Sequence, residues 1–105
     1  MAYPSSAITV GLLARIEAKP EKVEEVLDFL NRALTLAHEE EFTTIWFALR
    51  LGPTTFGIFD AFATDEHRAA HLEGKIADAF MGETARLLAK APEIVPVDIV
   101  AAKLP

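Results

Sequence analysis

The 105-residue sequence predicts one α+β domain, spanning residues 1–105, with four antiparallel strands and two helices. Three observations support this class. Apolar residues alternate with period two near both ends of the chain, two stretches show helical spacing, and two apolar runs in the middle are separated by Gly52-Pro53. The order β-α-β-β-α-β is the ferredoxin-like arrangement, which places both helices on one face of the sheet.

The first half of this pattern begins after a short lead at residues 3–6. Alternation from Ile8 to Ile16 predicts a strand, and Lys19-Pro20-Glu21 marks the start of a helix. A helical stripe of apolar residues continues to about His38. The run Glu39-Glu40-Glu41 then ends the helix or caps it with solvated charge.

A β-hairpin follows, because residues 42–51 and 55–63 are rich in aromatic and β-branched side chains. A turn loop of two or four residues would pair Trp46 with Phe59 and would place Trp46 on the face opposite Asp60, whereas an odd-length loop would break this pairing. With the even loop, the face of Asp60 also carries Ile45, Phe47, Leu49, Phe56, Ile58 and Phe62.

The second helix begins at an N-cap, Thr64, followed by two acidic residues in the first turn. The helical pattern continues to about Lys90, with Gly74 and Gly82 as weak points where the helix bends or breaks. Ala91-Pro92 stops the helix, and alternation over residues 93–103 predicts the last strand.

Composition excludes several classes of function. The absence of Cys excludes disulfides, thiolate nucleophiles, cysteine zinc sites and iron–sulfur clusters. Sixteen acidic residues against ten basic ones give a net charge of −6, which argues against nucleic acid or an anionic membrane as a partner. The longest uncharged stretch, residues 1–14, is too short to span a bilayer and has no basic start, so we expect a cytoplasmic protein.

The predicted sheet has a second apolar face that two helices on one side cannot cover. Strand residues on both sides are apolar, and a bare face of this size exceeds the apolar patches of most soluble monomers. We therefore expect a homodimer in which two sheets meet through this face.

The segment from Phe56 to Leu72 leads from an apolar strand through acidic Asp60 and aromatic Phe62 into a helix that carries His71. In this pattern it resembles the antibiotic biosynthesis monooxygenase family. The resemblance implies a dimeric α+β barrel and a cofactor-independent monooxygenase that acts on a small reduced aromatic, of quinol or anthrone type. The alternative is a non-catalytic dimeric module of the same fold, which binds a small molecule or supports a partner. That alternative is favoured because the Asn and the second helical His of the catalytic members have no counterpart here.

His71 is the leading catalytic candidate, because imidazole takes up or orients a proton near neutral pH. Asp60 is its expected partner, because a carboxylate on an apolar face is costly unless it is paired. The structural alternatives are a half-buried His bonded to the backbone and an Asp paired with an Arg or an amide.

The remaining candidates concern the substrate and a metal. His67 lies four residues before His71, but two His on one helix without a third ligand are a weak metal signal, so we expect no metal. The resemblance implies that no cofactor is needed. Haem is a further alternative, which would need an axial ligand beside an open apolar slot. The candidate substrate-binding residues, whose alternative role is in the core or a dimer interface, are Trp46, Phe47, Phe62, His67 and Phe80.

Overall fold

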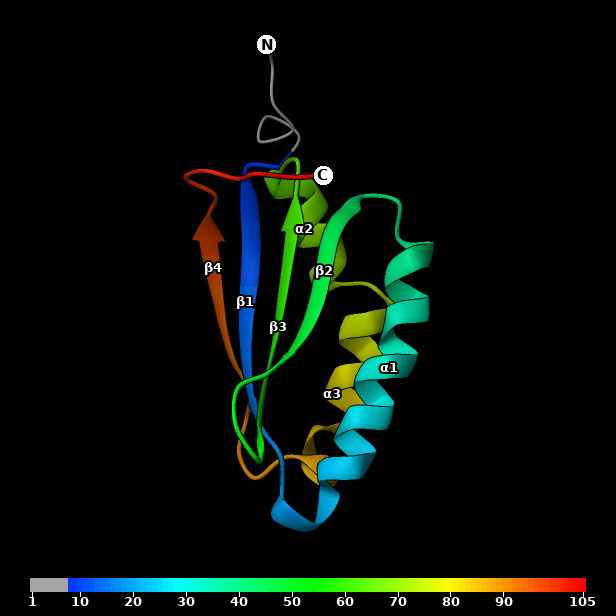
Figure 1. Ribbon diagram of the computed structural model, residues 1–105. Helices are drawn as coiled ribbons and strands as arrows, with labels where there is room; N and C mark the ends of the chain where they lie inside the picture. Colours follow the sequence, from blue (N-terminus) through cyan, green and yellow to red (C-terminus); the bar gives the residue numbers. More distant parts are fainter. Residues whose placement is uncertain (1–7) are drawn as a thin grey trace.

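The computed structural model describes residues 8–105, and the predicted lead at residues 3–6 lies outside this range. A four-stranded sheet has the order β2-β3-β1-β4, with every neighbouring pair antiparallel. This confirms the predicted α+β, ferredoxin-like class (Figure 1). The elements are β1 (Val10–Glu17), the short 3-10 helix η2 (Pro20–Lys22), α1 (Val23–Glu39), β2 (Thr43–Arg50), β3 (Thr55–Phe62), α2 (Asp65–Leu72), α3 (Lys75–Leu87) and β4 (Glu93–Asp98).

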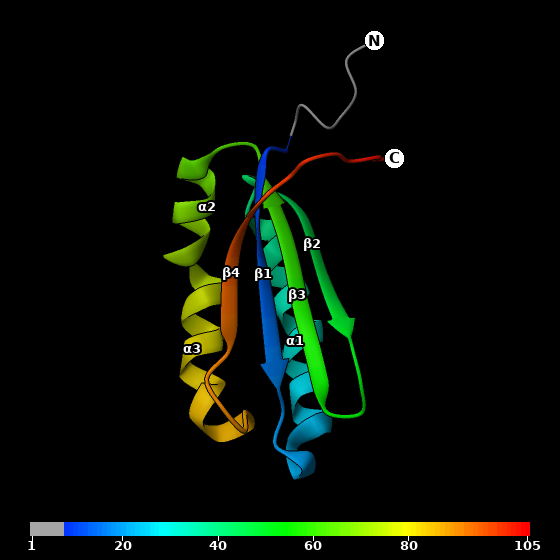
Figure 2. The same cartoon turned by 90° about the vertical axis from the view of Figure 1, so that its left-hand side faces the viewer.

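The three α-helices lie on one face of the sheet, as Figure 2 shows from the β4 edge. Between the two layers, alternate residues of β1 and β3 pack against the apolar stripes of α1 and α3. Phe56, Phe62 and Ile16 are the largest fully buried side chains. This core fixes β3 in the middle of the sheet, where it holds Asp60 against the helices.

The predicted register of the hairpin is wrong by one residue. Trp46 pairs with Asp60 and Phe47 pairs with Phe59. The turn closes through the Leu51 N–H, which donates to the Thr55 carbonyl at 2.8 Å, so the loop between them has an odd length. Because side chains alternate along a strand, a one-residue slip exchanges the two faces. Trp46 therefore faces the helices beside Asp60, and Phe47 faces away.

The predicted second helix is divided at Gly74. The N–H of Gly74 donates to the His71 carbonyl at 3.0 Å and ends α2, and α3 starts one residue later. At its N-terminus, the Thr64 hydroxyl accepts a hydrogen bond from the His67 N–H, which confirms the predicted cap. Gly82 lies inside α3 without a break. The last strand ends at Asp98, and residues 99–105 continue without regular structure.

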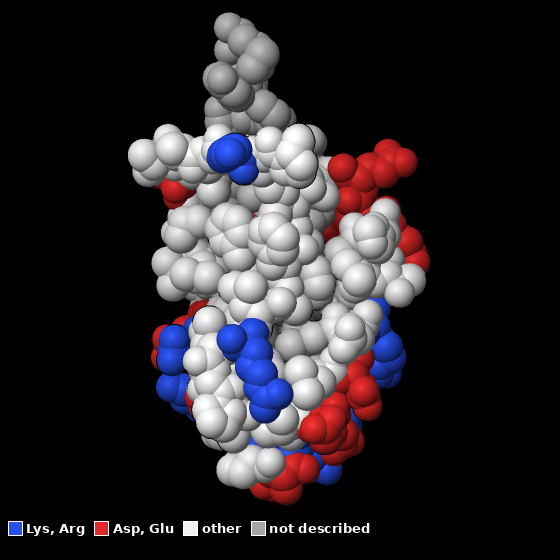
Figure 3. Space-filling view, in the orientation of Figure 1, with Lys and Arg blue, Asp and Glu red and all other residues white. Residues whose placement is uncertain are grey.

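The other face of the sheet carries no helix. Leu13, Phe47, Leu49 and Val95 are exposed on it. Figure 3 views the molecule from this side and shows an uncharged surface across much of the middle, with most charges at the rim. Among residues 8–105, no helix is both long and apolar enough to cross a membrane.

Candidate functional site

Asp60 occupies the centre of the helix-facing side of the sheet. Its direct neighbours across the strands are Leu12 in β1 and Trp46 in β2. Only 2% of Asp60 is exposed, so its carboxylate has lost almost all contact with water. A buried carboxylate is strongly destabilising unless a cation or a hydrogen-bond donor compensates it.

His71 supplies that compensation from α2. Its Nε2 lies 2.9 Å from Asp60 Oδ2, and its Nδ1 lies 2.7 Å from Glu40 Oε1. The ring packs against Phe62, with 5.1 Å between ring centroids, and the residue is 6% exposed. The imidazole is therefore held between two carboxylates, one on β3 and one just beyond α1.

Glu40 is the residue of this group that sequence reasoning missed. We expected the three consecutive Glu residues to be solvated, but the Glu40 side chain turns inward to His71. It also accepts a hydrogen bond from the Thr43 hydroxyl at 2.8 Å, and its own N–H donates to the Ala37 carbonyl. The sequence gives no signal that separates Glu40 from its two neighbours, because the choice depends on where α1 ends relative to α2.

The two carboxylates determine the charge of His71. Burial alone lowers the pKa of an imidazole, but the hydrogen bonds to Asp60 and Glu40 and the attraction of their charges outweigh it, so the pKa of His71 is raised above its ordinary value of 6.5. When the ring is protonated, both ring nitrogens carry protons and both donate to a carboxylate. In that form His71 is a cation between Asp60 and Glu40, and it has no free lone pair with which to act as a base.

We expect the stability of the fold to decrease above neutral pH as His71 loses its proton. The His71 pKa is higher in the folded chain than in the unfolded chain. The stabilisation is therefore complete below about pH 6.5 and is lost as the pH rises through the folded-state value. Urea unfolding between pH 6 and 9 measures this loss. A His71→Gln variant should lack this part of the pH dependence, and an equal slope in both proteins would contradict the assignment.

Gly74 allows Glu40 to reach His71. A Cβ at position 74 would lie 2.6 Å from Glu40 Oε2, so the carboxylate would have to move. We expect Gly74→Ala to weaken the Glu40–His71 hydrogen bond and to lower the His71 pKa relative to the unmodified protein, as NMR titration would measure. Gly82→Ala is the matched control, since a Cβ there meets nothing within 4 Å. The control should leave the His71 pKa unchanged and stabilise α3 by up to about 1 kcal/mol.

A cavity of about 60 Å³ lies beside this group. It is bounded by Asp60, His71, Trp46 and Phe80, and its remaining wall is apolar, formed by Leu12, Ala14, Ile58, Leu72, Ile76, Ala77 and Ile94. Two buried side-chain atoms within residues 8–105 have no hydrogen-bond partner, Asp60 Oδ1 and Trp46 Nε1. Both belong to residues of this cavity wall, so the site has an unused acceptor and an unused donor.

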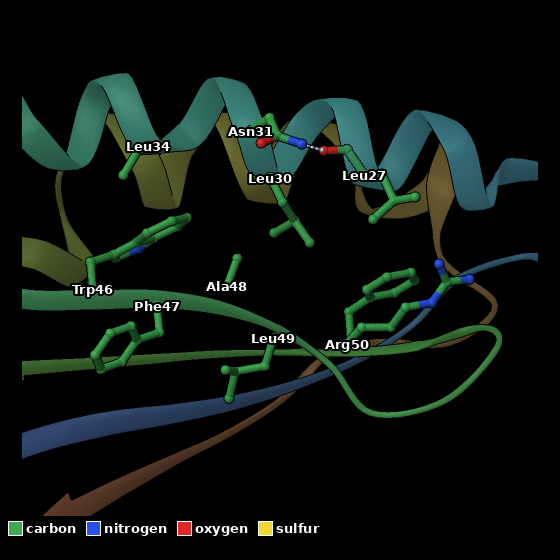
Figure 4. A pocket seen from close by; sticks show the side chains of 10 residues that line it. Leu27, Leu30, Asn31, Leu34, Trp46, Phe47, Ala48, Leu49 and Arg50 are labelled. Carbon is green, nitrogen blue, oxygen red and sulfur yellow. Dashed lines mark hydrogen bonds between the residues drawn. The ribbon is translucent and has the colours of Figure 1, made fainter.

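The structure does not bring every predicted substrate-binding residue to the cavity. Phe62 supports the His71 ring from the core without lining the cavity. His67 is exposed on α2 and packs against Phe42, with 5.8 Å between ring centroids. Phe47 is 53% exposed and points away from α1 (Figure 4). Trp46 and Phe80 are the two predicted aromatics that reach it.

An open groove of about 350 Å³ lies on the other side of Trp46, between α1 and the edge strand β2 (Figure 4). Trp46 and Ala48 point into it from β2, opposite Leu30 and Leu34 of α1. Trp46 thus lines both this outer groove and the inner cavity beside Asp60.

Haem does not fit the arrangement around His71. Both ring nitrogens lie within hydrogen-bond distance of a carboxylate, so neither is free to coordinate iron. The adjoining cavity of about 60 Å³ is also far smaller than a porphyrin ring.

The fold resembles that of solved structures assigned to the antibiotic biosynthesis monooxygenase type. One solved structure, from Nitrosomonas europaea, is provisionally assigned as an antibiotic biosynthesis monooxygenase. It has 18% sequence identity to this chain and a TM-score of 0.79, and the match covers 88% of this chain and 99% of that chain. A protein of the same provisional assignment from Caulobacter crescentus has 18% identity and a TM-score of 0.76, with 90% and 92% covered. The predicted resemblance is confirmed for the fold.

A second Nitrosomonas europaea protein, of unknown function, is much more similar. Its crystal structure has 50% sequence identity to this chain and a TM-score of 0.92, with 95% of this chain and 97% of that chain covered. The chain therefore belongs to the same family as this protein of unknown function. No model of a known protein family matches the sequence, and no curated protein matches it.

Proposed function

We propose that the chain is a cofactor-independent monooxygenase that acts on a small reduced aromatic, of quinol or anthrone type. One observation carries the proposal: a buried carboxylate, Asp60, is paired with His71 through one oxygen, its other oxygen has no hydrogen-bond partner, and the residue lines an apolar cavity. A fixed base in an apolar site is suited to removing a weakly acidic proton. The antibiotic biosynthesis monooxygenase fold supports this choice of reaction.

In the proposed reaction, Asp60 takes a proton from the ring CH2 or the hydroxyl of the substrate. The resulting anion gives one electron to O2, and the two radicals combine into a peroxide that takes up one proton. Loss of water from the peroxide leaves a carbonyl on the ring. One oxygen atom of O2 thus ends in the product and the other in water. The substrate carbon loses two electrons more than it would in a simple hydroxylation.

His71 is a positioning residue in this scheme. It is protonated, it donates to Asp60 Oδ2, and it leaves Asp60 Oδ1 as the atom that receives the substrate proton. Glu40 holds the other ring nitrogen, so the imidazole keeps one orientation throughout the reaction. Trp46 and Phe80 form the aromatic part of the wall.

Oxygen uptake by metal-stripped protein with a panel of quinols and anthrones tests the proposal. We expect uptake above the autoxidation rate, and a loss of about 100-fold or more in Asp60→Asn and His71→Ala. His38→Gln, which changes an exposed His on α1, should retain the activity. Unchanged uptake in both site variants, with folding verified by circular dichroism, would contradict the assigned roles.

A non-catalytic ligand-binding module is the second candidate, and the size of the cavity favours it. Apolar cavities that bind benzene measure about 150 Å³, whereas this one measures about 60 Å³. The Asp60–His71–Glu40 group would then serve only to join three elements of the fold. Tight binding of an aromatic compound without any oxygen uptake would identify this function.

We further propose that the protein acts as a homodimer formed through the open face of the sheet. The exposed residues Leu13, Phe47, Leu49 and Val95 give this face an apolar surface that soluble monomers rarely leave uncovered. A second copy covers it with the same residues under two-fold symmetry. The site lies on the opposite side of the sheet, so each protomer keeps its own cavity.

A further inference from the structure

The two unpartnered polar atoms belong to cavity-lining residues that face each other on neighbouring strands. Trp46 of β2 and Asp60 of β3 are direct cross-strand partners, and both side chains are on the helix-facing side. The Cβ atoms of such a pair are about 5 Å apart. Trp46 Nε1 and Asp60 Oδ1 nevertheless make no hydrogen bond to each other or to any other described residue.

Their chemistry limits what can lie between them. An indole N–H only donates, and a carboxylate oxygen only accepts. Buried polar groups in native proteins nearly always have partners, so a complementary group is required here. A hydroxyl accepts from Trp46 and donates to Asp60 at the same time. An ether or a ketone cannot satisfy Asp60, an ammonium group cannot satisfy Trp46, and an anion would lie next to a second negative charge.

We propose that the Trp46–Asp60 pair binds the hydroxyl group of a small, neutral alcohol or phenol. This inference rests on the proposed function in one respect, because it identifies the part of the substrate that meets Asp60. The cavity of about 60 Å³ holds the hydroxyl and the first atoms attached to it. The rest of the ligand extends toward Leu72 and Ile94, which line the same cavity and are 48% and 42% exposed, so they form its solvent side.

The two contacts predict selection for the hydroxyl form over a capped form of the same ring. Anisole retains the acceptor oxygen of phenol but cannot donate to Asp60, and toluene has neither function. We expect phenol to bind at least about tenfold more tightly than either compound, because only phenol donates a hydrogen bond to the buried Asp60 carboxylate. Isothermal titration calorimetry measures the three dissociation constants. In the unmodified protein, the fluorescence of the single Trp reports binding independently.

Trp46→Phe keeps an aromatic ring and removes the N–H donor. We expect the phenol–toluene ratio of dissociation constants to fall by about threefold or more in this variant, because toluene has no oxygen that accepts from the Trp46 N–H. Phe47→Leu is the matched control, because it changes the next residue of the same strand on the opposite face and should leave the ratio unchanged. The comparison of ligands on the unmodified protein stands even where a variant fails to fold.

Equal affinity for the three compounds, or binding of none of them, would overturn the inference. A bound water that bridges the two atoms and persists in crystals soaked with phenol would overturn it as well. Preference for phenol together with an absence of oxygen uptake supports the binding site and refutes the proposed oxygenase. Oxygen uptake that is lost in Asp60→Asn, without a preference for the hydroxyl form, supports the proposed oxygenase and refutes this binding site.

Discussion

Replacing His71 with Ala should lower the free energy of unfolding by about 3–5 kcal/mol. The change removes the cation from between Asp60 and Glu40 and leaves one carboxylate almost wholly buried without compensation. Removing one partner of a buried ion pair costs more than the pair itself contributes, because the remaining charge has lost its hydration. Urea unfolding monitored by circular dichroism at pH 7 measures the difference.

His67→Ala is the matched control on the same helix. His67 is exposed, so its removal should change stability by no more than about 0.5 kcal/mol. A loss below about 1 kcal/mol at pH 7 would mean that the Asp60 and Glu40 charges are compensated by something other than His71.

Replacing Leu13 with Asp should convert the proposed dimer to a monomer. Leu13 lies on the central strand β1, and its cross-strand neighbours Phe59 and Val95 share the open face. In a single protomer the side chain is 44% exposed, so a carboxylate there keeps much of its hydration. In the dimer it would be buried without a partner, which we expect to raise the dissociation constant by at least about 30-fold.

Sedimentation at micromolar concentration distinguishes these states, since one chain has a mass of 11.5 kDa. Met81→Asp is the control, because Met81 is 62% exposed on α3, which packs on the other face. That variant should sediment like the unmodified protein. Sedimentation of the unmodified protein as a monomer would contradict the proposed dimer.

Sequence periodicity was sufficient to predict the order and class of the elements. Alternation in β1 and the Thr64 cap of α2 are local signals, and the structure reproduces both. The pairing of β2 with β3 could not be predicted, because it depends on whether the loop at Gly52-Pro53 has an odd or an even number of residues. That single residue of register decides that Trp46, and not Phe47, faces Asp60.

The candidate site was predicted only in part for a related reason. His71 and Asp60 stand out in sequence as polar residues in apolar surroundings, and the structure places them 2.9 Å apart. Glu40 does not stand out, since it is the middle residue of three consecutive Glu. Its role follows from tertiary contacts: the end of α1, the Thr43 hydroxyl and the space that Gly74 leaves open.

The protonation state of His71 is the most direct test of the central claim, that a His cation orients Asp60 as the base of the site. Nitrogen-15 NMR of the imidazole ring at pH 7 measures it, because protonated and unprotonated ring nitrogens have well-separated shifts. We expect protons on both Nδ1 and Nε2 of His71. A neutral ring with one unprotonated nitrogen at this pH would contradict it and would return the role of base to His71.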